Sequence, residues 1–192
     1  TFGQATKPSG ASTVRVAVVG LGGQGMVLLQ DLLHRVAGVE VRAVCDIWEY
    51  GRLRAERGAD GARTYASLDA MLAKEKAGLD AVVVAVPDRQ HAQITIQCLE
   101  AGLHVYCEAP MAYDLEGAAA MVRTARRTGK LLQIGHQRRS HPGYVHLARR
   151  FAGDPKNKLI WDGGPGMGKH RDPDWIKPID GPIRHVEAVN RV

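Results

Sequence analysis

Short apolar runs alternate with amphipathic segments from residue 14 to residue 151. Runs of apolar, β-branched residues predict buried strands, and apolar positions three and four residues apart predict helices that bury one face. The predicted strands cover residues 14–19, 39–45, 63–65, 79–86, 103–107 and 130–135. The predicted helices cover residues 24–36, 48–57, 67–76, 89–100, 115–128 and 142–151.

This regular alternation predicts an α/β fold, with a doubly wound parallel sheet and right-handed crossovers. Residues 79–86 form a continuous apolar run, which is typical of a strand buried on both faces of a parallel sheet. The pattern changes after Gly153, because residues 153–192 are rich in glycine and proline. Only residues 159–161 and 183–192 suggest regular elements there, so we expect an incomplete second α/β domain.

The turn between the first predicted strand and helix carries the strongest motif. The letters G-L-G-G-Q-G begin at Gly20 and fit the pattern G-x-G-x-x-G. Gly20 permits the tight turn, Gly22 lets the backbone approach a pyrophosphate, and Gly25 lets the helix pack on the sheet. The helix N-terminus, with Gly23 and Gln24, offers free N–H groups to phosphates. The motif therefore predicts a Rossmann dinucleotide site.

A carboxylate ends the second predicted strand. Asp46 lies about 20 residues after Gly25, where an acidic side chain can accept both ribose hydroxyls of an adenosine and repel a 2′-phosphate. This position favours NAD over NADP. Asp46 is also a plausible N-cap for the helix at 48–57, and the two roles are compatible. Arg52 and Arg54 follow closely and could accommodate a 2′-phosphate, so NADP stays an alternative cofactor.

Two histidines follow strands at the same predicted edge of the sheet. Pro87 and His91 come after the fourth strand, and His136 comes after the sixth. Ligands of open parallel sheets bind at the carboxyl ends of the strands, so His91 and His136 are candidate catalytic residues. The alternatives are a surface or capping histidine for His91 and a polar loop residue for His136. Asp88 is expected to cap the helix at 89–100.

Composition restricts the class of protein. The chain has 192 residues, 45% hydrophobic and 24% charged, which suits one α/β domain and part of a second. No apolar run approaches the roughly 18 residues of a transmembrane helix. The net charge is +6, but the basic residues are dispersed and aromatic residues make up 5%. We therefore expect no nucleic-acid or membrane partner and a cytoplasmic location, with an export signal removed before Thr1 left open.

Cysteine and histidine spacing predicts neither a disulfide framework nor a metal site. The cysteines are odd in number, lack C-x-x-C spacing and are expected to be buried free thiols: Cys45, Cys98 and Cys107. Three histidines outside the strand ends match no closed metal site: His141, His146 and His170.

Five stretches together resemble the Gfo/Idh/MocA family, the glucose-fructose oxidoreductase and inositol dehydrogenase group. In chain order they are VAVVGLGGQG, AVCD, AVPDRQH, AGLHVYCEAPMA and GHQRR. The resemblance implies an N-terminal Rossmann domain that holds a nicotinamide dinucleotide. It implies a C-terminal α/β domain that covers the substrate and often builds a homo-oligomer. Such enzymes transfer a hydride from a sugar, a cyclitol or a related polyol.

The resemblance also assigns individual roles. The residues that match the family's cofactor-binding motifs are Gly20, Gly22, Gly25, Asp46, Pro87, His91 and Glu108. Pro87 and His91 match a motif near the nicotinamide half, and Glu108 matches the acid of the family's E-K-P beside the nicotinamide ribose. The implied parts are a flexible leader at 1–13, an NAD(P)-binding Rossmann domain at 14–140, and a connecting helix with a remnant of the C-terminal domain at 141–192.

Two departures separate this chain from the family pattern. The E-K-P motif reads E-A-P, so Ala109 replaces a lysine that assists proton transfer. Losing a general acid–base group typically costs about 10²–10⁴ in rate. The family's D-x-x-x-H pair is also absent, because Gly181 stands where its aspartate would precede His185. Two alternatives therefore stay open: an NAD-dependent glycoside hydrolase of the same family and a catalytically silent dinucleotide-binding protein.

Overall fold

The computed structural model describes residues 13–59, 61–137 and 141–143. The strands are β1 (Val14–Val19), β2 (Val39–Cys45), β3 (Arg63–Tyr65), β4 (Ala81–Val84), β5 (His104–Glu108) and β6 (Leu132–Gly135). The α-helices are α1 (Gly23–His34), α2 (Glu49–Glu56), α3 (Leu68–Glu75), α4 (His91–Glu100) and α5 (Leu115–Thr128). Two short 3₁₀ turns are η1 (Lys76–Gly78) and η2 (Asp88–Gln90).

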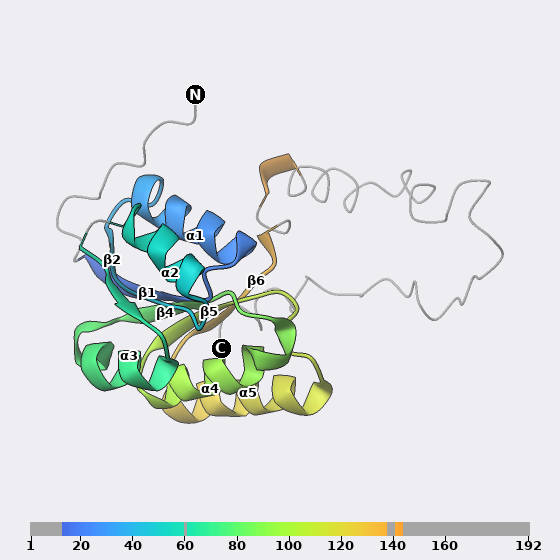
Figure 1. The fold of residues 1–192 in the computed structure, drawn as a ribbon. Coiled ribbons are helices and arrows are strands. Elements are labelled where there is room, and N and C mark those ends of the chain that lie inside the picture. Colours follow the sequence, from blue (N-terminus) through green and yellow to red (C-terminus); the bar gives the residue numbers. More distant parts are fainter. Residues whose placement is uncertain (1–12, 60, 138–140, 144–192) are drawn as a thin grey trace, which may run out of the picture. The chain divides into compact units, whose positions relative to one another are not determined.

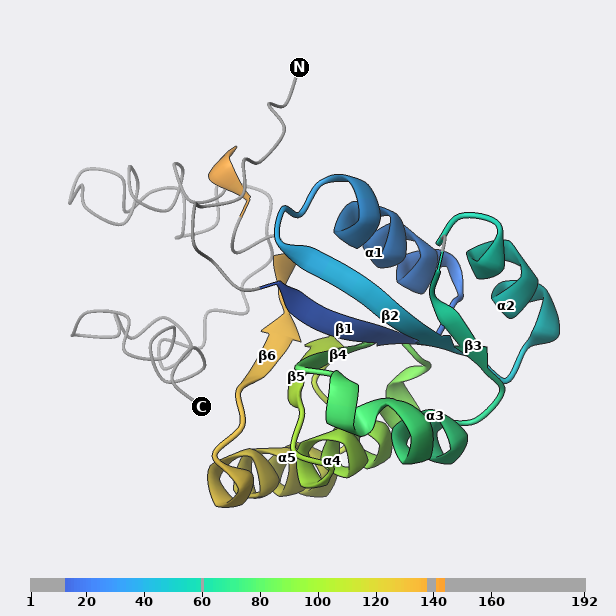
Figure 2. The same ribbon diagram turned by 90° about the vertical axis from the view of Figure 1, so that its left-hand side faces the viewer.

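The six strands form one sheet in the order β3-β2-β1-β4-β5-β6, and every neighbouring pair is parallel. Helices α1 and α2 cover one face of the sheet, and α3, α4 and α5 cover the other (Figures 1 and 2). The predicted doubly wound parallel Rossmann sheet is thereby confirmed. The strand order reverses between β1 and β4, which is where open parallel sheets bind ligands.

Side chains of the central strands alternate between two apolar clusters, one on each face of the sheet. Val18 and Val44 pack with Leu29 on the side of α1 and α2. Ala17 and Val84 pack on the opposite side with residues of α3, α4 and α5. Because both faces are covered, β4 is apolar along its length, as the sequence pattern predicts.

Caps fix the ends of several helices. The Ser67 hydroxyl accepts a hydrogen bond from the N–H of Ala70 at 3.2 Å and so caps α3. Gly129 ends α5 in the left-handed conformation at φ 65°. The predicted cap by Asp88 is wrong. Asp88 begins the η2 turn instead, and the N-cap of α4 is Gln90, which makes no side-chain capping hydrogen bond.

The three cysteines are buried free thiols, as predicted. Removal from water raises the pKa of Cys98 to about 12 and that of Cys45 and Cys107 to about 11. These thiols therefore stay protonated near neutral pH and contribute to packing.

Among the described residues, those up to Gly135 form one compact unit, and His136 and the described residues after it belong to a second. Residues 1–12 of the expected leader at 1–13 lie outside the described residues, as do all residues from 144 onward. Most of the predicted helix at 142–151 and the predicted elements at 159–161 and 183–192 therefore lie outside them too. The boundaries at 13, 140 and 141 stay predictions. In the described part of the chain, no helix has the length and apolar character needed to cross a membrane.

An ion pair joins the start of the central strand β1 to the residue before β4. The guanidinium of Arg15 donates to both oxygens of Asp80, at 2.8 and 3.0 Å, and the Arg15 backbone N–H donates to Oδ2 at 2.8 Å. These hydrogen bonds from Arg15 lower the pKa of Asp80 from 3.8 to about 2. A carboxyl group whose pKa is lower in the folded state stabilises the fold above its ordinary pKa, and this contribution is lost as pH falls.

Asp80→Asn should lower the free energy of unfolding at pH 7 by about 1 kcal/mol, the upper end of the range for partly exposed ion pairs. The difference from the wild type should shrink between pH 3.8 and pH 2, because protonation removes the same charge in the wild type. Urea unfolding of both proteins at pH 7, 4 and 2.5 measures this difference in the free energy of unfolding. A difference that stays constant over this interval would contradict the assignment.

Candidate functional site

The glycine turn after β1 brings two pieces of backbone unusually close together. Gly20 has φ +93°, a conformation that favours glycine. A Cβ atom on Gly25 would lie 1.8 Å from the carbonyl oxygen of Gly20. A Cβ atom on Gly20 would lie 2.3 Å from the carbonyl oxygen of Ala85. The fold itself therefore requires glycine at both positions, as the sequence predicts for the tight turn and for helix packing.

Gly22 and Gly23 differ from Gly20 and Gly25, because the fold itself does not require glycine at either position. Gly22 has an ordinary φ of −68°, and a Cβ atom at either position would meet no described heavy atom within 4 Å. No side chain caps the start of α1, and its first turn holds no acidic residue. The backbone N–H groups at this helix N-terminus are thus uncapped by side chains, and the partial positive charge there suits an anionic group.

Asp46 is tied to the same turn. Its Oδ2 accepts a hydrogen bond from the N–H of Leu21 at 2.5 Å, and its Oδ1 accepts one from the N–H of Trp48 at 2.7 Å. Each carboxylate oxygen keeps a further lone pair for a ligand hydroxyl. The alternative role as the N-cap of α2 is wrong, because Trp48 occupies the N-cap position.

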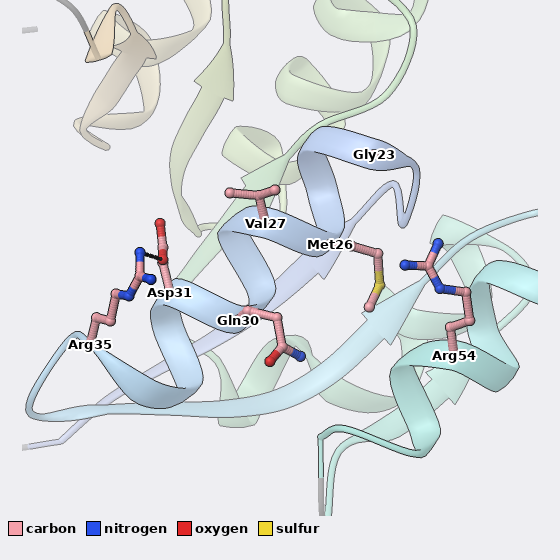
Figure 3. A pocket seen from close by; sticks show the side chains of 7 residues that line it. All are labelled: Gly23, Met26, Val27, Gln30, Asp31, Arg35 and Arg54. Carbon is pink, nitrogen blue, oxygen red and sulfur yellow. Dashed lines mark hydrogen bonds and ion pairs between the residues drawn. The ribbon is translucent and has the colours of Figure 1, made fainter.

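The two arginines of α2 have separate environments. Nη1 of Arg52 donates to the backbone carbonyls of Asp46 and Ile47, at 2.7 and 3.0 Å, and so holds the loop that carries Asp46. Arg54 lies 5.8 Å from the centroid of the Tyr50 ring. Arg54 also lines a groove of about 490 Å³ on the outer side of α1, and its side chain points toward Met26 (Figure 3). Arg54 is therefore the arginine whose guanidinium lies beside the start of α1.

Glu108, at the end of β5, is a largely buried carboxylate with several donors. Its Oε1 accepts from the side-chain amide of Gln24 at 3.1 Å and from the hydroxyl of Tyr106 at 3.3 Å. Its Oε2 accepts from the N–H of Ala109 at 3.1 Å. The Gln24 contact joins the phosphate-type turn of α1 to the far end of β5, so the structure brings two predicted cofactor-binding residues together.

His91 is buried, with 1% of its surface exposed. Nδ1 lies 2.7 Å from the carbonyl oxygen of Pro110, and Nε2 lies 2.8 Å from that of Val86. The ring therefore joins the segments that follow β4 and β5. Both nitrogens face backbone carbonyls in this arrangement, so the ring presents neither of them to a ligand. The catalytic and cofactor-binding roles of His91 stay predictions.

The remaining predicted site residues are exposed at strand ends. Pro87 precedes η2, and its carbonyl accepts from the N–H of Gln90 at 2.8 Å. His136 follows β6 directly and belongs to the second compact unit. The roles of Pro87 and His136 are not tested by this geometry. Among the described residues, no group of three or more His, Cys, Asp or Glu side chains is arranged to hold a metal.

Sequence reasoning missed Tyr106, although a signal was present. Residues two apart on a strand share one face, so Tyr106 and Glu108 are neighbours by strand period alone. The Arg52 contacts and the Gln24–Glu108 hydrogen bond have no comparable local signal, because they depend on tertiary structure.

Residues 14–136 match the family model described as "Oxidoreductase family, NAD-binding Rossmann fold", the GFO_IDH_MocA family. The match covers most of the chain, and the chain belongs to this family. Residues 14–136 are thus an NAD-binding Rossmann domain, which confirms the cofactor predicted from the glycine turn and Asp46.

Individual relatives agree with the family. Inositol 2-dehydrogenase 1 of Saccharopolyspora erythraea is 38% identical over 148 residues, which cover 74% of this chain and 44% of the relative. The WlbA dehydrogenase of Chromobacterium violaceum, solved with NADH and UDP-GlcNAcA, has a TM-score of 0.69 and 32% identity over 77% of this chain and 42% of its own. The myo-inositol 2-dehydrogenase of Lactobacillus plantarum has a TM-score of 0.68 and 26% identity, covering 72% and 40%.

The chain spans less than half the length of the curated relatives that it matches.

The glycines allow folding and binding to be separated by mutation. Gly25→Ala should destabilise the fold by several kcal/mol or abolish folding, because its Cβ atom would overlap the Gly20 carbonyl. Gly22→Ala should leave the melting temperature within a few degrees of the wild type and weaken NAD binding at least tenfold, because the methyl group would occupy the ligand's space. Thermal unfolding and calorimetric titration with NAD measure the two effects. Equal NAD affinity in Gly22→Ala and wild type would contradict the assignment.

Proposed function

We propose that this chain binds NAD at the glycine turn and forms the cofactor-binding part of an oxidoreductase that acts on a sugar, a cyclitol or a similar polyol. The observation that carries the proposal is Gly22. Neither its backbone conformation nor any described neighbour requires a glycine there, whereas a pyrophosphate lying against the backbone would.

The described residues fit the cofactor on chemical grounds. The uncapped N-terminus of α1 supplies N–H donors for the pyrophosphate. Asp46 keeps free lone pairs for the two hydroxyls of the adenosine ribose, and its charge disfavours a 2′-phosphate. Glu108 is the carboxylate proposed for the nicotinamide-side ribose. When bound, NAD supplies the nicotinamide ring that takes up the hydride, and the protein orients it.

The substrate class rests on the family and on inositol dehydrogenases among the relatives. A sugar, cyclitol or polyol hydroxyl must lose a proton as its carbon loses a hydride. Ala109 cannot accept that proton, and His91 has both nitrogens on backbone carbonyls. We infer that His136, or a residue outside the described part, takes this role. Assembly as a homo-oligomer is proposed on the same family ground.

A catalytically silent dinucleotide-binding protein is the second candidate, and Ala109 favours it. The residue is exposed at the end of β5 and its only side-chain atom is a methyl group, which neither donates nor accepts a proton. The other alternative is an NAD-dependent glycoside hydrolase. It is supported by the same single feature, the absence of the lysine.

Asp46→Asn should change the choice between cofactors. Leu21 and Trp48 donate to different oxygens of Asp46, so the amide keeps one of these two hydrogen bonds. The substitution also removes the charge that repels a 2′-phosphate. We expect weaker NAD binding and a fall in the NAD-to-NADP affinity ratio of about tenfold. Calorimetric titration with both cofactors measures this ratio. An unchanged ratio would show that Asp46 does not face the adenosine ribose.

Ala109→Lys tests whether the site can support turnover. Restoring a general acid–base group should raise the rate of NADH formation with a responsive polyol by about 10²–10⁴. The assay uses the full chain with a panel of inositols and sugars, and Ala109→Met serves as the control of similar size. NAD binding without NADH formation in either protein favours the silent candidate. Release of an aglycone from a glycoside without net NADH favours the hydrolase.

A further inference from the structure

Two carboxylates flank the glycine turn, and the turn holds each of them. Asp46, at the end of β2, accepts from the N–H of Leu21. Glu108, at the end of β5, accepts from the side chain of Gln24. The strand order places β1 and β4 between these two strand ends. A dinucleotide has two riboses, one on each side of its pyrophosphate, so the arrangement offers one carboxylate to each ribose.

We propose that Tyr106 and Gln24 are positioning residues that orient Glu108, so that its Oε2 accepts a hydroxyl of the nicotinamide-side ribose. The proposal rests on the proposed function, because it requires a dinucleotide at the glycine turn. It adds Tyr106 to the site and gives Gln24, which was predicted to lie at the phosphate turn, a second role toward Glu108.

The hydrogen bonds to Glu108 determine which oxygen is left for a ligand. A carboxylate offers about four lone-pair positions, two on each oxygen. Oε1 already accepts from Gln24 and from Tyr106, so both of its positions are filled. Oε2 accepts only from the N–H of Ala109 among the described hydrogen bonds. Ala109 is itself exposed, so Oε2 is the oxygen that is bonded to a surface residue.

Tyr106 is held in place by a close contact with β6. Glu108 pairs with Gly135 in the parallel ladder. A Cβ atom on Gly135 would lie 2.4 Å from the Tyr106 hydroxyl oxygen and 3.1 Å from Cδ of Glu108. The absence of a side chain at Gly135 therefore provides the space in which the phenol and the carboxylate meet.

The Tyr106 hydroxyl is protonated, as a hydrogen-bond donor to Glu108 must be. Burial, followed by the charge of Glu108, raises the pKa of Tyr106 to about 12. The hydroxyl group therefore keeps its proton near neutral pH and donates it to Oε1. The ring packs against the apolar cluster on the α1 side of the sheet, so the phenol has little freedom to turn away.

Binding of three ligands tests the parts of the site separately: ADP, ADP-ribose and NAD. ADP carries the adenosine and the pyrophosphate but lacks the second ribose, which ADP-ribose and NAD both contain. In the wild type, ADP-ribose should therefore bind more tightly than ADP. Tyr106→Phe and Gln24→Met should each reduce the ratio of the ADP to the ADP-ribose dissociation constant about tenfold, the lower end of the usual effect of losing a hydrogen bond to a charged group.

A residue that acts through Glu108 has no effect once Glu108 is gone. In a Glu108→Ala background, adding Tyr106→Phe should leave the ADP-ribose affinity unchanged. Tyr65→Phe is the matched control, because it removes another part-buried tyrosine–glutamate hydrogen bond, to Glu75, on the edge strand β3. This control should lower stability without changing the ligand ratio. Gln24 is exposed, so Gln24→Met keeps the test valid if Tyr106→Phe fails to fold.

The outcomes distinguish a failure of the proposed function from a failure of the positioning role. If the wild type binds neither ADP nor NAD, the proposed function fails. If the wild type binds ADP and ADP-ribose equally well, or if both variants keep the wild-type ratio, the positioning role is overturned while dinucleotide binding stands. An additive effect of Tyr106→Phe in the Glu108→Ala background also overturns it.

Discussion

The close packing of α1 on β1 through Gly20 and Gly25 is the constraint on which the rest of this structure depends. A single Cβ atom on Gly25 would come within 1.8 Å of the Gly20 carbonyl oxygen. Because neither residue has a side chain, the first turn of α1 lies directly beyond the carboxyl end of the central strand. That placement aims the N–H groups of the helix at the point where the strand order reverses, which is where a dinucleotide pyrophosphate binds in this fold.

Much of this fold could be predicted from local sequence alone. Strand and helix periods differ, and strands buried on both faces are apolar throughout, so β4 and its neighbours were identified with errors only at their ends. The distinct roles of Gly20 and Gly25 follow from the motif and are confirmed. The same reasoning failed for Asp88, because a 3₁₀ turn after Pro87 delays the start of α4.

The environment of each candidate site residue was harder to predict, because it depends on contacts between distant segments. His91 occupies the expected strand end, yet its ring faces two backbone carbonyls from separate segments. Arg52 holds the backbone of the Asp46 loop, whereas the sequence suggested only a role toward a phosphate. Tyr106 lies beside Glu108 by strand period, but Gln24 reaches Glu108 from α1, and the spacing of α1 and β5 along the chain carries no information about that contact.

The residues that favour cofactor binding are distinct from the group that turnover requires. The features that favour a dinucleotide are backbone features and carboxylates: an uncapped helix end, Gly22, Asp46 and Glu108. Proton transfer requires a further group, and Ala109 does not supply one at the position where the family has lysine. Cofactor binding is therefore the central claim, and oxidation of a polyol is a second claim that depends on residues beyond the glycine turn.

The most direct test of the central claim is a crystal structure of the chain grown with NAD. The account predicts pyrophosphate oxygens within hydrogen-bonding distance of the N–H groups at the start of α1, with the cofactor in contact with the Cα atom of Gly22. It also predicts an adenosine ribose on Asp46 and the second ribose on Glu108. A cofactor bound elsewhere, or riboses turned away from both carboxylates, would contradict it.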